Sequence, residues 1–94
     1  MSYEIYEKII QPNDTVIHKP SGEIWVVCGV DYNKGDLIPC GYPLPTLAKL
    51  SDCELIEKGY IRYGGQKPEY IEALKKDGLD RFIDVRSAIY YGFI

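Results

Sequence analysis

The fold of this protein is decided by residues 14–31, which read DTVIHKPSGEIWVVCGVD. The stretch begins with β-branched residues, which favour strands. A Pro-Ser-Gly turn signal follows at 20–22, where proline presets φ and glycine accepts a positive φ. We therefore predict two strands, over 15–19 and 23–30, that fold back on each other.

The second of these strands carries apolar residues on both faces. The two-residue period of a strand places one set together, namely Ile24, Val26, Cys28 and Val30. Because that face is uniformly apolar, we expect it to point into the core. Trp25, the only tryptophan in the chain, then lies on the opposite face.

The rest of the first two thirds is short and punctuated by turns. The segment DYNKGD at 31–36 is a hairpin signal, and the proline-containing segment 41–52 predicts an irregular crossover with a helical turn at 46–50. Residues 3–10 fit a helix or a strand equally well. Further strands are expected over 37–40, over 53–57 and, as a strand or extended piece, over 59–63.

The last third changes to a helical pattern. Pro68 suits the first turn of a helix and Gly78 suits the position just past its end. A second helix fits Asp80 as its N-cap and Gly92 as its terminator. The second helix has a wide apolar stripe, so we expect it to pack against the sheet.

These elements predict an α+β fold in one domain over 1–94. Residues 13–63 form a small antiparallel barrel or curled sheet, and residues 67–92 form the helical part. The strand order resembles SH3-like barrels of the KOW and Tudor kind, through DTVIHKPSGEIWVVCGVD and the later LSDCELIE. The first stretch also resembles small uncharacterised proteins of bacterial genomes and prophages. These resemblances imply a fold and no mechanism.

Charge and cysteine content indicate which kind of partner the protein binds and in which cellular compartment it lies. A net charge of -3 argues against binding driven by nucleic-acid phosphates. The chain shows neither a membrane-spanning run nor a signal peptide. Three cysteines without a secretion signal predict free thiols in the cytoplasm.

The sequence gives little support for catalysis or for metal binding. The chain has a single histidine, His18, and none of the common hydrolase, phosphate-loop or dinucleotide motifs. A zinc site would need His18 with Cys28, Cys40 and Cys53, whose spacing lacks the close pairs typical of such sites. We therefore expect no enzyme activity, no metal and no cofactor.

Aromatic side chains are the strongest candidates for binding. Nine tyrosines accompany the single tryptophan. Trp25 is either covered by the C-terminal helices or partly exposed as an anchor for a partner. By the resemblance to SH3-like barrels, Tyr32 and Tyr42 lie at one end of a ligand groove. Such a groove suits a proline-rich peptide or a methylated amine.

For two further segments, the sequence allows either a packing role or a binding role. Arg62 between Tyr60 and Tyr63 fits a stacking platform for single-stranded nucleic acid, although packing is the more common role of such residues. The apolar end AIYYGFI either packs on its own domain, which we favour, or completes a homodimer.

The sequence thus predicts a non-enzymatic protein-binding or adaptor module that uses exposed aromatic residues. The alternatives are a KOW-like nucleic-acid-binding protein and a structural subunit or homodimer. The nucleic-acid alternative requires one shared surface for Lys19, Lys34, Lys49, Arg62 and Lys67.

Overall fold

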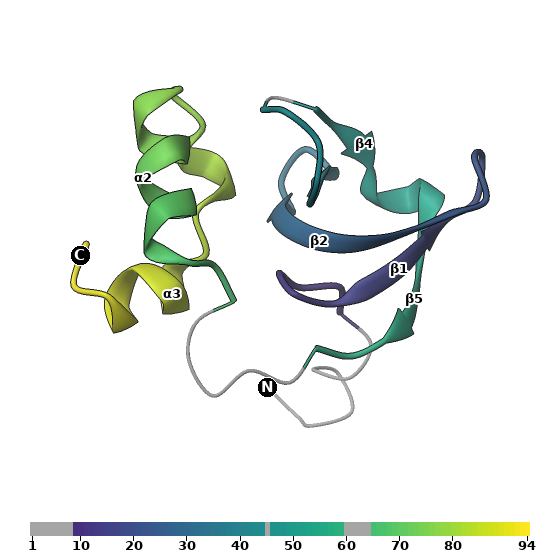
Figure 1. The fold of residues 1–94 in the computed structure, drawn as a ribbon, viewed down its shortest axis with the longest axis horizontal. Helices are drawn as coiled ribbons and strands as arrows, with labels where there is room; N and C mark the ends of the chain where they lie inside the picture. The colour runs from purple at the N-terminus through teal and green to yellow at the C-terminus, as the bar shows by residue number, and fades with distance from the viewer. Residues whose placement is uncertain (1–8, 45, 60–64) are drawn as a thin grey trace.

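A curved antiparallel sheet and a group of short helices form two sides of the molecule (Figure 1). The structure is a computed structural model, and it describes residues 9–44, 46–59 and 65–94. The five strands follow the order β4-β3-β2-β1-β5. The strands are β1 (Thr15–His18), β2 (Glu23–Asp31), β3 (Asp36–Pro39), β4 (Ala48–Lys49) and β5 (Cys53–Glu57). The helices are the 3-10 turns η1 (Leu50–Asp52) and η2 (Asp80–Phe82) and the α-helices α2 (Pro68–Lys76) and α3 (Val85–Tyr90).

Two glycine turns set the ends of the first three strands. Gly22 has φ 73° and Gly35 has φ 72°, which are conformations that side chains with a Cβ disfavour. The Gly22 amide donates to the His18 carbonyl at 2.7 Å, and the Gly35 amide donates to the Asp31 carbonyl at 2.8 Å. Both predicted turns, and the antiparallel pairing of β1 with β2 and of β2 with β3, are confirmed.

The segment between β3 and β5 differs from the expected helical turn at 46–50. Ala48 pairs with Leu37 of β3, so this part of the chain forms the short strand β4. The helical turn comes later, as η1, in which the Cys53 amide donates to the Leu50 carbonyl. An α+β fold with an antiparallel sheet before two helices is confirmed. No hydrogen-bonded pair joins β4 to β5 among the described residues, and closure into a barrel stays a prediction.

The sidedness of β2 is the main correction. Ile24 is 66% exposed and Val26 is 42% exposed, whereas Val27 is 1% exposed. Trp25 packs against the inner cluster, because its direct partner on β1 is the fully buried Val16. Directly opposed residues of two paired strands share a face. The prediction that one inward face holds Ile24, Val26, Cys28 and Val30 is therefore wrong.

A β-bulge explains why part of that prediction survives. The register of β2 against β3 shifts between Val27 and Gly29, which leaves Cys28 as an extra residue on β2. An extra residue moves the alternation by one position. Val30 beyond the bulge therefore lies in the inner cluster, as expected, while Cys28 packs toward the helices.

The first predicted helix is confirmed and the second is interrupted. Pro68 begins α2, and Gly78 follows its end with φ 71°. The second segment splits into η2 and α3, because Ile83 between them is extended. The cap of α3 is Asp84, whose carboxylate accepts from the Arg86 amide at 3.2 Å, so Asp80 is not the N-cap that the sequence predicts. Within the described ranges, no helix is long and apolar enough to cross a membrane.

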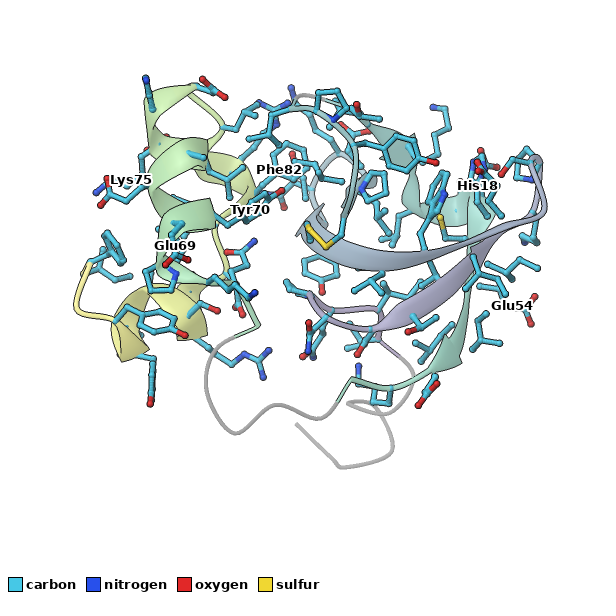
Figure 2. The ribbon with its side chains drawn as sticks, viewed as in Figure 1. His18, Glu54, Glu69, Tyr70, Lys75 and Phe82 are labelled. Atoms are coloured by element: carbon cyan, nitrogen blue, oxygen red, sulfur yellow. A yellow bond between two sulfur atoms is a disulfide. The ribbon has the colours of Figure 1, made fainter. Side chains whose placement is uncertain are left out.

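The helices cover a different part of the sheet from the one that holds Trp25. Their cluster with β3 consists of Ile38, Leu74, Leu79 and Phe82. Gly29 favours this close packing, since a Cβ there would lie 3.3 Å from Gln66 Nε2 and 3.4 Å from the Cβ of Phe82. Figure 2 shows Phe82 and Tyr70 on the sheet-facing side of the helices, far from His18. The helices therefore do not provide the cover for Trp25 that the sequence allows.

The C-terminal segment is partly packed and partly exposed. Ala88 is buried, and the Phe93 amide donates to the Ala88 carbonyl at 2.8 Å. Ile89 is 60% exposed and Ile94 is 76% exposed. Packing of this end on its own domain thus holds for some of its residues, and a homodimer through the exposed ones stays a prediction.

The corrected sidedness of β2 predicts different effects for two neighbouring valines. Val27→Thr is expected to lower the free energy of unfolding by about 2 kcal/mol, because it buries a hydroxyl in the inner cluster. Val26→Thr is expected to change it by less than about 0.5 kcal/mol, because that side chain faces solvent. Urea unfolding measures both. A larger loss for Val26→Thr would contradict the observed sidedness.

Candidate functional site

An aromatic stack lies at the end of the sheet remote from the helices (Figure 2). The rings of His18 and Trp25 are stacked, with centroids 4.2 Å apart and planes at 16°. The ring of Tyr42 lies edge-on to that of Trp25, with centroids 6.0 Å apart and planes at 68°. The structure thus brings together two of the predicted binding residues, Trp25 and Tyr42, and adds His18.

Strand register explains why these rings meet. Val16 opposes Trp25 and His18 opposes Glu23, so His18 is the diagonal neighbour of Trp25 on the inner face. Diagonal neighbours on one face are within reach of aromatic side chains. The stack therefore follows directly from the position of the hairpin turn.

Polar contacts hold the rim of the stack in place. The Tyr42 hydroxyl donates to the carboxylate of Glu23, at 3.3 and 3.5 Å from its two oxygens. His18 Nδ1 lies 2.7 Å from Ser21 Oγ, which also accepts from the Glu23 amide at 3.2 Å. The turn between β1 and β2 thus fixes both the histidine and the glutamate.

A hollow of about 460 Å³ opens beside the stack. His18 and Trp25 form its aromatic wall, and Leu47, which is 42% exposed, adds an aliphatic side chain. The charged residues that line it are Asp36, Lys49 and Asp52, and Ala48 completes the lining. The two carboxylates outnumber the single ammonium group of Lys49, so the hollow favours a cation beside an aromatic ring.

The indole nitrogen of Trp25 has an unused hydrogen bond. Trp25 Nε1 is buried and has no hydrogen-bond acceptor in the described part of the chain. A buried donor without an acceptor costs roughly 1–3 kcal/mol.

Tyr32 lies elsewhere, in a separate hollow of about 590 Å³ that Arg81, Asp84 and Arg86 also line. Its hydroxyl donates to the Ile10 carbonyl. The residue is 55% exposed. Burial, with the nearby Asp84 and Asp14 carboxylates, raises the pKa of Tyr32 to about 12. The structure therefore separates Tyr32 from Trp25 and Tyr42.

The remaining predicted residues cannot be placed in a common site. Tyr60, Arg62 and Tyr63 lie outside the described residues. Of the lysines that a nucleic-acid surface would need, Lys34 and Lys49 line one hollow, and Lys67 lines another.

The cysteines correct the expectation of free thiols. Cys28 and Cys40 form a disulfide, with Cα atoms 5.1 Å apart. Cys53 is a free, buried thiol, and burial raises its pKa. A zinc site made of His18 and the three cysteines would need the two sulfurs that form this disulfide.

Sequence reasoning missed several residues of this hollow. The sequence presents His18 as a candidate for catalysis or zinc binding alone, and it gives no signal for Asp36 or Asp52. Their proximity depends on register between strands that are distant in sequence. The one usable signal was the place of His18, beside the turn and opposite Glu23.

Comparisons with known proteins give no relative to reason from: no protein-family model, no curated protein and no solved structure matches the chain.

Proposed function

We propose that this chain is a non-enzymatic protein-binding or adaptor module of the cytoplasm. Its partner presents a flexible segment whose basic side chain enters the hollow beside Trp25, next to a proline or another apolar residue. The observation that carries the proposal is the stacked pair of His18 and Trp25 at a hollow with two carboxylates. Tyr42 lies edge-on to Trp25.

The physical logic combines three contributions. The ring faces attract a cation and bury its aliphatic stem, as aromatic residues do at many binding hot spots. Asp36 and Asp52 favour positive charge in the same hollow. Proline fits because it offers an apolar ring and stiffens the segment before binding.

We also propose that the sheet belongs to the SH3-like class. The support is the strand order β4-β3-β2-β1-β5 with the 3-10 turn η1 between the last two strands in the chain. The first half of β2, residues 23–26, pairs with β1, and the second half, residues 27–31, pairs with β3. The bulge at Cys28 lies just after the change of partner. This class would place Trp25 and Tyr42 at a ligand groove.

Tyr42→Ala tests the function without disturbing the core. A short synthetic peptide that alternates lysine and proline is expected to bind saturably, and calorimetry measures its affinity. Tyr42, which is 40% exposed, should contribute about 2 kcal/mol, so its loss weakens binding roughly thirtyfold. Trp25 is less suitable for truncation to alanine, because it also packs against the inner cluster.

Two controls make this result specific. Tyr32→Ala removes a tyrosine from the other hollow and should leave the affinity unchanged. A matched peptide with glutamate in place of lysine should bind far more weakly. Equal affinity for the two peptides, or an equal loss in the two tyrosine variants, would refute binding at the Trp25 hollow.

A further inference from the structure

The Cys28–Cys40 disulfide occupies a position where the sheet does not depend on it. Cys28 is the bulged residue of β2, and Cys40 follows the last residue of β3. The Cys40 amide already donates to the Val26 carbonyl at 2.8 Å, and pairs from Val27 to Asp31 continue the ladder. The two strands are thus held by backbone hydrogen bonds on both sides of the bond between the sulfurs.

A hollow gives other molecules access to this disulfide. It measures about 240 Å³, and both cysteines line it, each of them half-buried. Lys67 is exposed at the same hollow, and its ammonium group favours an incoming thiolate. Tyr70 also lines the hollow, and its buried hydroxyl has no hydrogen-bond partner in the described chain. Figure 2 shows the disulfide on the side of the sheet that faces the helices.

The disulfide is close in the chain to the aromatic stack. Tyr42 follows Cys40 after a single residue, Gly41, whose φ is 87°. The contacts that keep Tyr42 in place are the edge-on contact with Trp25 and the exposed hydrogen bond to Glu23. Fixing Cys40 by a covalent bond therefore limits how far Tyr42 can move from Trp25.

From this arrangement we propose that Cys28–Cys40 is a reversible thiol–disulfide exchange site, and that its reduction releases Tyr42 from Trp25. The effect on partner binding rests on the proposed function, whereas the exchange itself does not. A disulfide of this kind fits a cytoplasmic protein, because disulfides there are usually transient or redox-sensing.

The reaction uses a dithiol as the reductant. Its thiolate attacks Sγ of Cys40, the sulfur at the loop end, while Cys28 packs against the helix-side cluster. The bond between the two protein sulfurs breaks, Cys28 leaves as a thiolate and takes up a proton, and a mixed disulfide forms on Cys40. The second thiol of the reductant, once deprotonated, displaces Cys40, which leaves as a thiolate and is protonated. Two electrons pass to the protein, and the reductant becomes a cyclic disulfide.

The test uses the full chain before and after treatment with dithiothreitol. Alkylation followed by mass spectrometry should count one free thiol before reduction and three after it. Far-ultraviolet circular dichroism should stay unchanged, because the strands keep their hydrogen bonds. Acrylamide quenching of Trp25 should increase, and affinity for the lysine–proline peptide should fall at least about fivefold. Oxidised dithiothreitol should restore the starting values.

Variants separate this proposal from its alternatives. Cys40→Ser should behave like the reduced protein under oxidising conditions, and Cys53→Ser should behave like the unmodified one. A disulfide that resists dithiothreitol, reduction that unfolds the domain, or reduction without any change at Trp25 would each overturn the proposal. If Trp25 quenching changes but neither form binds the peptide, the exchange site is supported and the proposed function fails.

Discussion

Replacing Lys58 with methionine is expected to lower the free energy of unfolding by about 3–5 kcal/mol. Lys58 Nζ lies 2.7 Å from Asp14 Oδ2, and the two side chains are only 5% and 1% exposed. Removing one member of a buried ion pair leaves the other charge without compensation in a poorly solvated place. The loss would be a large fraction of the stability of a domain of this size.

The position of this pair in the chain adds to its importance. Asp14 also accepts from the Gln11 and Gly59 amides, each at 2.8 Å, and the Lys58 ammonium donates to the Ile9 carbonyl at 2.6 Å. Asp14 precedes β1 and Lys58 follows β5, so the network joins the start of the sheet to the end of its last strand. Loss of the charge should therefore weaken the β1–β5 edge as well.

Urea unfolding followed by Trp25 fluorescence measures this effect. Lys34→Met makes the same substitution at an exposed lysine and should cost less than about 0.5 kcal/mol. The double variant Asp14→Asn/Lys58→Met should recover part of the loss, because the uncompensated charge is gone. Similar stabilities for Lys58→Met and Lys34→Met would contradict a buried, structural ion pair.

The second large effect is expected for Gln66→Leu, at about 3 kcal/mol or more. The buried amide of Gln66 donates to the Phe82 carbonyl at 2.8 Å and to the Cys28 carbonyl at 2.9 Å. Its oxygen accepts from the Asp84 amide at 2.7 Å. Leucine would leave three backbone groups without these partners, each at a cost of about 1 kcal/mol or more.

This variant should also change how the protein unfolds. Gln66 links β2 to η2 and to the start of α3, so its loss should release the helices before the sheet. Hydrogen exchange should then show reduced protection in α2 and α3 while β1 and β2 keep theirs. Gln11→Leu is the matched control, because its side chain makes an exposed bond to Arg86, and it should cost less than about 1 kcal/mol. Uniform loss of protection would contradict a local linking role for Gln66.

Local signals explain the parts of the fold that the sequence predicts well. Gly22, Gly35 and Gly78 adopt the positive φ for which glycine was expected, and Pro68 begins its helix. These features depend on a few neighbouring residues. The turns, most strand boundaries and the first helix therefore follow from the chain itself.

The errors come from interactions between distant segments. Ile24 and Val26 looked like core residues because both faces of β2 are apolar, and composition cannot choose between such faces. The choice depends on β1, where buried Val16 opposes Trp25. The bulge at Cys28 then reverses which residues of β2 face the core, and no local sequence motif predicts this bulge.

The candidate site shows the same division. Trp25 and Tyr42 were predicted from their residue types, and the structure brings them together. His18 and Asp52 reach the same hollow through strand pairing and through η1, which spacing along the chain does not reveal. The Cys28–Cys40 bond likewise results from the pairing of β2 with β3.

The most direct test of the account is the indole resonance of Trp25 in a proton–nitrogen correlation spectrum. The chain has one tryptophan, so this signal is unambiguous, and its N–H has no acceptor in the described structure. Adding the lysine–proline peptide should shift this signal, together with the amides of His18 and Tyr42. A stationary indole signal, or an equal shift with the glutamate–proline peptide, would contradict a partner-binding hollow at Trp25.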